Sequence, residues 1–188
     1  MATALEMPEA TRKPDGVVLE PPPALPATEE RGDSQSGVLA LRQPVGDEQI
    51  VDVVRSYIRC FVKRDSEGFV DLLGADAVNL ENRQARGALI QDFTHRIQQH
   101  QADFAKLEGV DVARFDHMER YAAEDLGPHT DPPRPPMMRP GDVYARVPLN
   151  PTQASNGDPL FHSMLVMLLR RGADHKLHIV AVTELDAP

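Results

Sequence analysis

The stretch DEQIVDVVRSYIRCFVKRDSEGFVDLLG, residues 47–74, decides the fold, because its apolar residues recur at helical spacing. Asp47 is a suitable N-cap for a first helix. Asp65 or Ser66 can cap a second, short helix that Gly74 ends. The stretch therefore predicts two consecutive amphipathic helices. Their apolar residues are Ile50, Val51, Val54, Tyr57, Ile58, Phe61, Val62, Phe69, Val70, Leu72 and Leu73.

Beyond these helices the pattern gives one more helix and then changes to strands. A third helix is predicted after Gly87, and it fades near Leu107. Residues 127–140 hold six of the 17 prolines, so they can form neither a helix nor a central strand. This order predicts an α+β fold, with three N-terminal helices packed on a strongly curved antiparallel sheet, a cone or half-barrel. The expected strands are residues 110–122, 143–149, 160–171 and 177–185.

Composition divides the chain into a tail and one domain. Residues 1–46 contain seven prolines and little to bury, which predicts a disordered Pro-rich tail. Residues 47–188 then form the domain, with a Pro-rich loop inserted at 127–140. The net charge of −9 argues against nucleic-acid binding, which needs clustered Lys and Arg. We therefore expect no nucleic-acid partner.

The sequence has no recognisable targeting segment and a single cysteine. No run of 18 apolar residues exists, so no membrane span is expected. The N-terminus lacks the apolar core of a signal peptide, which favours a cytoplasmic location. Export after removal of a leader is the alternative. The single cysteine, Cys60, follows a helical pattern next to Phe61, and we interpret it as a buried, inert thiol.

The seven histidines raise the question of a metal site. His95 and His100 are five residues apart, so they do not share a helix face as paired ligands would. His117 and His162 fall on different predicted strands, and both could point inward. A hydrogen-bonded polar residue explains each of them as well as a ligand does. We predict no metal and no cofactor.

Three segments resemble the nuclear transport factor 2-like, or cystatin-like, superfamily. Residues 54–78 resemble its first helix, acidic cap and short second helix followed by Asp-Ala. Residues 86–93 are similar to the Gly-led start of its third helix. Residues 168–182 are similar to its closing hairpin, although the usual Trp is replaced around Leu177. The superfamily includes ketosteroid isomerases, SnoaL-type polyketide cyclases and noncatalytic modules, so the resemblance implies a fold rather than one reaction.

The isomerase branch implies catalytic roles for two residues, Tyr57 and Glu81. In that branch a tyrosine of the first helix donates a hydrogen bond to an oxyanion, and a carboxylate after the second helix moves the proton. Tyr57 falls on the tyrosine position and Glu81 on the general-base position. The late-strand carboxylate falls at Val166 or Met167, which cannot donate a hydrogen bond, so steroid isomerisation is not expected. Alternatively, Tyr57 is a core residue with its hydroxyl at the rim, and Glu81 lies in a solvated turn.

The resemblance implies a cone-shaped cavity, and hence a small-molecule-binding domain. An isomerase-, dehydratase- or cyclase-like enzyme with a small hydrophobic ligand is the hypothesis, and whether the chain is an enzyme stays open. The alternative is a noncatalytic interaction or assembly module, which forms a homodimer through its sheet and binds a partner with its N-terminal tail. The predicted ligand-pocket residues are Phe61, Phe93, Phe115, His117, His162, Met164 and Val166.

Overall fold

A computed structural model describes residues 44–186 of the chain. Most of the predicted tail, residues 1–43, lies outside the described residues. Val45, just before the first helix, is buried, and its carbonyl oxygen accepts a hydrogen bond from Nη1 of Arg120 at 2.9 Å. The boundaries of the tail and of the domain stay predictions.

The three predicted helices are present: α1 (Asp47–Lys63), α2 (Ser66–Leu72) and α3 (Arg86–Ala105). Asp65 caps α2, because its Oδ1 accepts a hydrogen bond from the backbone N–H of Gly68 at 2.8 Å. A Cβ at residue 68 would lie 2.3 Å from the Asp65 carboxylate, so any other residue there would displace the capping side chain. Local chemistry thus sets where the second helix begins.

The strands form a mixed five-stranded sheet in the order β1-β7-β6-β3-β2, with a separate two-stranded sheet of β4 and β5. The predicted α+β class is confirmed. The sheet is open at both edges, and it differs from the expected antiparallel sheet because β1 runs parallel to β7. The bounds are β1 (Leu73–Asn79), β2 (Glu119–Ala122), β3 (Val143–Pro148), β4 (Thr152–Gln153), β5 (Pro159–Phe161), β6 (Met164–Arg171) and β7 (Leu177–Leu185).

Two segments differ from the predicted secondary structure. Within residues 110–122 only β2 is a strand, and Phe115–His117 form a short 3-10 helix, η1. Strand β1 was not predicted. Its pairing with β7 breaks register between Leu73 and Val78, so its side chains do not alternate regularly between buried and exposed.

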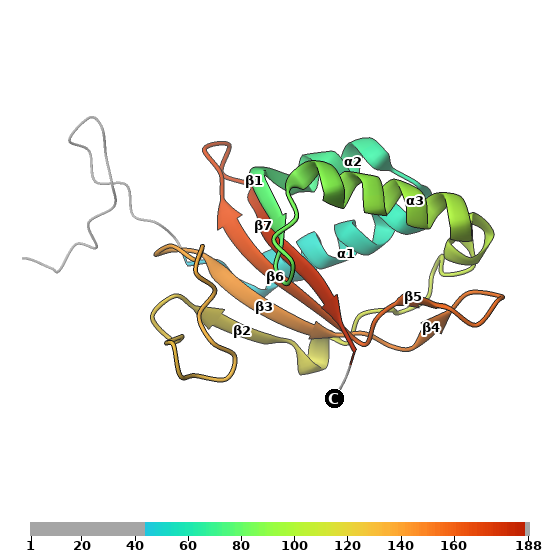
Figure 1. Cartoon of the computed structure of the whole chain (residues 1–188). Helices are drawn as coiled ribbons and strands as arrows, with labels where there is room; N and C mark the ends of the chain where they lie inside the picture. The colour runs from blue at the N-terminus through green and yellow to red at the C-terminus, as the bar shows by residue number, and fades with distance from the viewer. Residues whose placement is uncertain (1–43, 187–188) are drawn as a thin grey trace, which may run out of the picture. The chain divides into compact units, whose positions relative to one another are not determined.

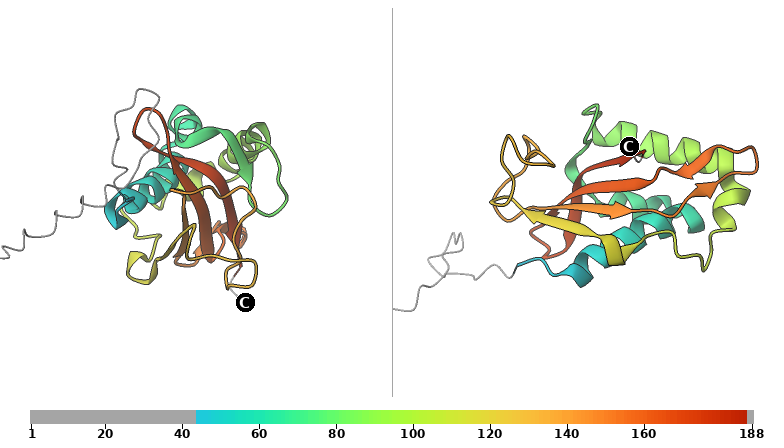
Figure 2. Two further views of the ribbon diagram at one scale, coloured as in Figure 1. Left: turned by 90° about the vertical axis from the view of Figure 1, so that its left-hand side faces the viewer. Right: turned by 90° about the horizontal axis from the view of Figure 1, so that it is seen from below.

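The three helices cover one face of the sheet (Figure 1; Figure 2). The core between these layers is dense with aromatic rings: Phe69 stacks on Phe93 at 4.0 Å between centroids, and Phe61 meets Phe93 edge-on at 4.6 Å. The interior of the predicted cone is therefore filled by side chains over this region. The rings are those of Phe61, Phe69, Phe93, Phe104 and Phe161.

The opposite face of the sheet is covered by the chain itself. Leu126 and Met138, from the loop between β2 and β3, pack in one buried cluster with Val166 and Leu168 of β6, both 0% exposed. This loop includes the predicted Pro-rich loop, and residues 127–140 contain no helix or strand. It lies at the end of the sheet away from the β4–β5 hairpin (Figure 2, right).

A bulge in β7 decides which of its side chains face the helices. Leu169 pairs with Ile179 and Leu168 pairs with Ala181, so Val180 is an extra residue. The extra residue shifts the later alternation by one position. Val182 and Glu184 therefore face the helices, where strict alternation from Ile179 would have turned them away.

Candidate functional site

A pocket of about 230 Å³ opens where α1 and α3 meet the end of β7. The structure brings Tyr57 of α1 and Glu81, from the turn after β1, to the same pocket. Polar side chains predominate around it. The lining residues are Tyr57, Asn79, Glu81, Leu89, Asp92, Arg96, His162, Val182, Thr183 and Glu184.

The Glu184 carboxylate is the hub of this pocket, with its side chain only 7% exposed. Its Oε1 accepts hydrogen bonds from the Tyr57 hydroxyl at 3.2 Å and from Nη1 of Arg96 at 2.8 Å. Its Oε2 accepts from Nη2 of Arg96 at 3.2 Å and from the backbone N–H of His162 at 3.1 Å. Both oxygens act as acceptors, which compensates the cost of burying the carboxylate.

Arg96 connects the polar pocket to the aromatic core. Its guanidinium carbon lies over the ring of Phe61 at 4.7 Å and over that of Phe161 at 5.5 Å. Nη2 also donates to the carbonyl of Leu160 at 2.5 Å. Burial alone disfavours the cation, but Glu184 beside it raises the guanidinium pKa above its ordinary value. Arg96 thus holds α3, β5 and β7 together at one point.

The Tyr57 hydroxyl is engaged with Glu184 rather than free. Burial, and then the neighbouring Glu184 charge, raise the pKa of Tyr57 well above 10.0. The phenol therefore stays protonated and donates a hydrogen bond to the carboxylate. To donate to a bound ligand instead, Tyr57 would first have to release this hydrogen bond.

The Glu81 carboxylate is presented by a tight turn. Oδ1 of Asn79 accepts hydrogen bonds from the backbone N–H groups of Glu81, at 2.9 Å, and of Asn82, at 3.1 Å. Among residues 44–186, no hydrogen bond or ion pair engages the Glu81 side chain. Asp92 also faces the pocket, and its Oδ2 lies 4.0 Å from Nη1 of Arg96. The pocket therefore offers two carboxylates whose hydrogen-bonding capacity is largely unused.

The other predicted pocket residues do not gather around one pocket. Phe61 and Phe93 are each 1% exposed within the aromatic core. Phe115 lines a separate groove beside α1. His117 is exposed in η1, with its Nε2 3.0 Å from Oδ2 of Asp116.

Of the remaining three, only His162 lines the pocket with Tyr57 and Glu81. Its Nδ1 lies 2.8 Å from Oδ1 of Asp186. Met164 and Val166 pack in the cluster on the opposite face of the sheet. The seven predicted residues are thus distributed over the core, two surface pockets, the outer face and an exposed turn.

Three important residues of this pocket escaped the sequence analysis: Asp92, Arg96 and Glu184. The first two lie on the polar side of the third predicted helix, and their spacing of four residues was the available signal. Glu184 supplies a late-strand carboxylate from β7, whereas the resemblance placed that position on β6 at Val166 or Met167. Val166 lies on the outer face, and Met167 is fully buried in the core.

Clusters of metal ligands and reactive thiols are two further kinds of site to consider in the described residues. Within residues 44–186, no group of three His, Cys, Asp or Glu side chains is arranged to hold a metal ion. Cys60 is buried, and burial raises the pKa of its thiol to about 11. In the same part of the chain, each helix is too short or too polar to cross a bilayer.

Comparison of the structure with solved structures returns proteins of similar fold. A Nostoc punctiforme protein of unknown function with a cystatin-like fold is 9% identical, covers 78% of this chain and 96% of its own, with a TM-score of 0.47. Aln2 from a Streptomyces species is 15% identical, with coverages of 75% and 92% and a TM-score of 0.44. A candidate ketosteroid isomerase from Shewanella frigidimarina is 9% identical, with coverages of 74% and 98% and a TM-score of 0.43.

No protein-family model matches the sequence, and no curated protein matches it significantly. The matched structures are 9 to 15% identical and their TM-scores are 0.43 to 0.47, so no family or function is inferred from them. In the described residues, three helices precede most of the strands and cover one face of an open five-stranded sheet. The described residues therefore form an α+β fold, and no family is assigned.

Proposed function

We propose that this domain binds a small polar molecule in the pocket formed by Tyr57, Glu81, Asp92, Arg96 and Glu184. The proposal rests on two carboxylates, Glu81 and Asp92, that face one pocket. Beside them the charges of Arg96 and Glu184 already neutralise each other. Concave sites with a few convergent polar groups are where small molecules bind.

The charges of the pocket support a ligand that donates hydrogen bonds or carries positive charge. Arg96 and Glu184 neutralise each other through two hydrogen bonds. Glu81 and Asp92 then remain as acceptors with unused capacity. This polar lining favours an amine, amidine or polyol over the small hydrophobic ligand that the superfamily resemblance implied.

A catalytic role for Glu81 is part of the same proposal. A carboxylate with no protein partner at the edge of a pocket is free to accept a proton from a bound ligand. The Tyr57 hydroxyl would stabilise Glu184 and shape the pocket, since it already donates to that carboxylate. An isomerase-, dehydratase- or cyclase-like reaction would therefore use Glu81 as its base.

Ligand-observed NMR with a library of cationic, neutral and anionic fragments tests the binding proposal. Cationic and donor-rich fragments should bind, and Glu81→Gln combined with Asp92→Asn should weaken them at least about tenfold, or ~1.4 kcal/mol. Glu124→Gln is the matched control, because Glu124 is exposed and does not line the pocket. If the double variant and Glu124→Gln bind these fragments equally well, the proposal is wrong.

Turnover is tested separately from binding. Any reaction found among the bound fragments should be lost in Glu81→Gln, while binding falls only modestly and the melting temperature is unchanged. If Glu81→Gln retains full turnover, Glu81 is not the base, and the proposed function is then binding alone.

The assembly hypothesis stays a second proposal, and the homodimer stays a prediction. The outer sheet face offers little exposed apolar area for a dimer, because Val166, Leu168 and Ala181 are each already 0% exposed. Light scattering on the full chain tests it: a dimer that survives dilution would support the assembly role, and a monomer at all concentrations would count against it.

A further inference from the structure

His162 lies between β5 and β6 and lines the same pocket as Tyr57 and Glu81. Its backbone N–H donates a hydrogen bond to Oε2 of Glu184 at 3.1 Å, which fixes the residue beside the buried carboxylate. Its side chain is 42% exposed, so the ring can exchange protons with solvent. Among the described residues, His162 is the one histidine that lines this pocket. Its charge can therefore change where a ligand would bind.

The two ring nitrogens of His162 have different surroundings. Nδ1 lies 2.8 Å from Oδ1 of Asp186, which directly follows β7. An ionised carboxylate can only accept a hydrogen bond, so Nδ1 carries the proton in the neutral ring. Within residues 44–186, no hydrogen bond or ion pair engages Nε2. Nε2 can therefore take up a second proton while the contact to Asp186 is kept, and the pocket gains a positive charge without a rearrangement.

The charges around the ring decide what its protonation does. Arg96 and Glu184 neutralise each other through their ion pair. Glu81 and Asp92 then supply the negative potential that attracts a cationic ligand. A positive charge on His162 counteracts that attraction. The charged and titratable groups around the ring are Asp92 and Arg96 of α3, Glu81 of the turn after β1, Tyr57 of α1, and Glu184 and Asp186 at the end of β7.

We propose that protonation of His162 lowers the affinity of this pocket for cations, a regulation that rests on the function proposed above. With a neutral ring, Glu81 and Asp92 attract a cationic ligand. A protonated ring repels the same ligand and offsets part of the potential of the two carboxylates. Imidazole ordinarily gains its charge between about pH 5 and 8, so the affinity for cations falls as the pH is lowered through this range. An uncharged ligand of the same shape is not repelled and keeps its affinity.

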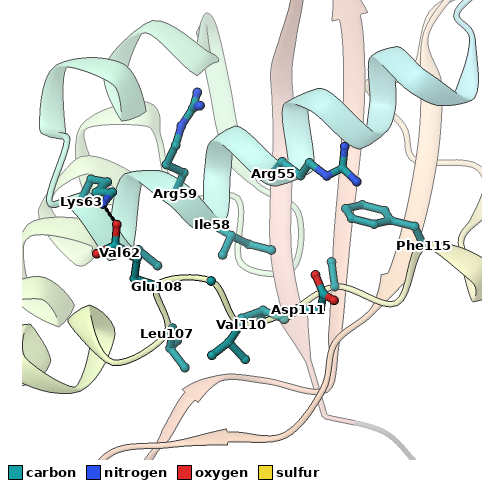
Figure 3. A pocket seen from close by; sticks show the side chains of 13 residues that line it. Arg55, Ile58, Arg59, Val62, Lys63, Leu107, Glu108, Val110, Asp111 and Phe115 are labelled. Carbon is teal, nitrogen blue, oxygen red and sulfur yellow. Dashed lines mark hydrogen bonds and ion pairs between the residues drawn. The ribbon is translucent and has the colours of Figure 1, made fainter.

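The groove beside α1 provides a contrast within the same chain (Figure 3). Within residues 44–186, no histidine lines this groove. Arginine, lysine and carboxylate side chains ordinarily titrate outside the range from about pH 5 to 8. The proposed pH dependence is therefore specific to the pocket that His162 lines. The charged residues that line the groove are Arg55, Arg59, Lys63, Glu108 and Asp111.

Ligand-observed NMR titration of the full chain with benzamidine, at about pH 8 and about pH 5.5, tests the proposal. Benzamidine keeps its positive charge over this range, and benzamide is the matched neutral ligand. The dissociation constant of benzamidine should rise about three- to fivefold at the lower pH, because the protonated ring repels it. The dissociation constant of benzamide should change by less than about 1.5-fold.

Three variants assign the effect to one side chain. His162→Gln removes the titrating ring, so its affinity for benzamidine should become nearly independent of pH. His162→Lys keeps a positive charge at both pH values and should bind benzamidine weakly at both. His129→Gln is the matched control and should retain the pH dependence of wild type, because His129 is exposed in the Pro-rich loop and does not line the pocket.

The possible failures of this inference and of the proposed function are distinguishable. If benzamidine binds wild type equally well at the two pH values, this inference is wrong and the proposed function stands. The same conclusion follows if His162→Gln keeps the pH dependence of wild type, since another group then causes it. If benzamidine binds at neither pH, the proposed binding of cations is wrong, and this inference fails with it.

Discussion

Two arginine–carboxylate pairs hold opposite faces of the same sheet. On the helix side Arg96 forms an ion pair with Glu184. On the outer side Arg170 donates hydrogen bonds to Asp142 through Nε, at 2.8 Å, and Nη2, at 2.7 Å. Both carboxylates are nearly buried, with side chains 7% and 2% exposed. Their surroundings differ. Asp142 also accepts a hydrogen bond from the backbone N–H of Arg139 in its own loop, whereas Glu184 accepts one from Tyr57 at the edge of a pocket.

This difference teaches that a buried ion pair does not by itself mark a functional site. The pair at Asp142 fastens the Pro-rich loop to β6, and the second partner of Arg170, Asp76, lies 3.2 Å away. The pair at Glu184 has two nearby carboxylates, Glu81 and Asp92, that face a pocket with unused hydrogen-bonding capacity. The neighbours of each pair, and not the pair, distinguish a structural clamp from a candidate binding site.

The largest expected effect is that of Glu184→Ala, which should lower the free energy of unfolding by about 3–5 kcal/mol. The substitution leaves the Arg96 cation, beside the rings of Phe61 and Phe161, with only its weak 4.0 Å contact to the exposed Asp92. Urea denaturation measures the loss. The double variant Arg96→Met/Glu184→Met is the control and should be more stable than Glu184→Ala, because neither charge is then left alone. A loss below ~1 kcal/mol for the single variant would contradict this assignment.

Asp142→Ala should cost less, about 2–3 kcal/mol, because Arg170 keeps Asp76 at 3.2 Å, whereas Arg96 keeps Asp92 only at 4.0 Å. The effect should also be local. Hydrogen exchange should speed up in residues 126–142 before the sheet core opens. If the loop instead stays as protected as in wild type while the whole domain loses stability, the Arg170–Asp142 pair stabilises the entire domain. It then does not differ from the Arg96–Glu184 pair in this respect.

Tyr57→Phe should cost about 1 kcal/mol, since it removes one hydrogen bond to Glu184 and leaves the ring in place. It should also alter the response to alkali. The pKa of Tyr57 is higher in the folded chain than in the unfolded one, so raising the pH above about 10 ionises the unfolded chain first and lowers stability.

Urea titrations between about pH 9 and 11 measure this linkage. Wild type should lose stability with rising pH more steeply than Tyr57→Phe. Tyr144→Phe is the comparison variant, because burial raises the pKa of that tyrosine without a hydrogen bond to a carboxylate. If stability falls with pH equally in wild type and in Tyr57→Phe, the folded environment of Tyr57 does not raise the pKa of its hydroxyl.

Asp92→Asn should have the smallest effect on stability, about 0.5 kcal/mol or less. The Asp92 side chain is 65% exposed, and its 4.0 Å contact with Arg96 is weak. Thermal melting should be unchanged, while binding of a cationic fragment in the pocket should fall. If melting drops by several degrees instead, Asp92 belongs to the Arg96 clamp rather than to the binding surface.

Much of the fold was predictable because it depends on short-range patterns. The predicted first helix and the last strand, residues 177–185, match the observed elements, since apolar spacing is a local signal. The N-cap of the first helix is Gly46, and the predicted cap, Asp47, is its first residue. Strand β1 was missed because its partner β7 lies far along the chain, and because its register break hides the alternation. The pocket was predictable in part: the resemblance brought Tyr57 and Glu81 to one place but assigned Phe61 and Phe93 to the cavity rather than to the core.

The sequence by itself determined the α+β class and the order of helices before most strands. These features depend on helical spacing, caps and turn residues, which act over a few positions of the chain. Only the tertiary structure decided that Glu184, rather than a residue of β6, supplies the carboxylate at Tyr57. The reason is the single extra residue, Val180, in β7: it shifts the alternation by one, and that shift is set by pairing with β6.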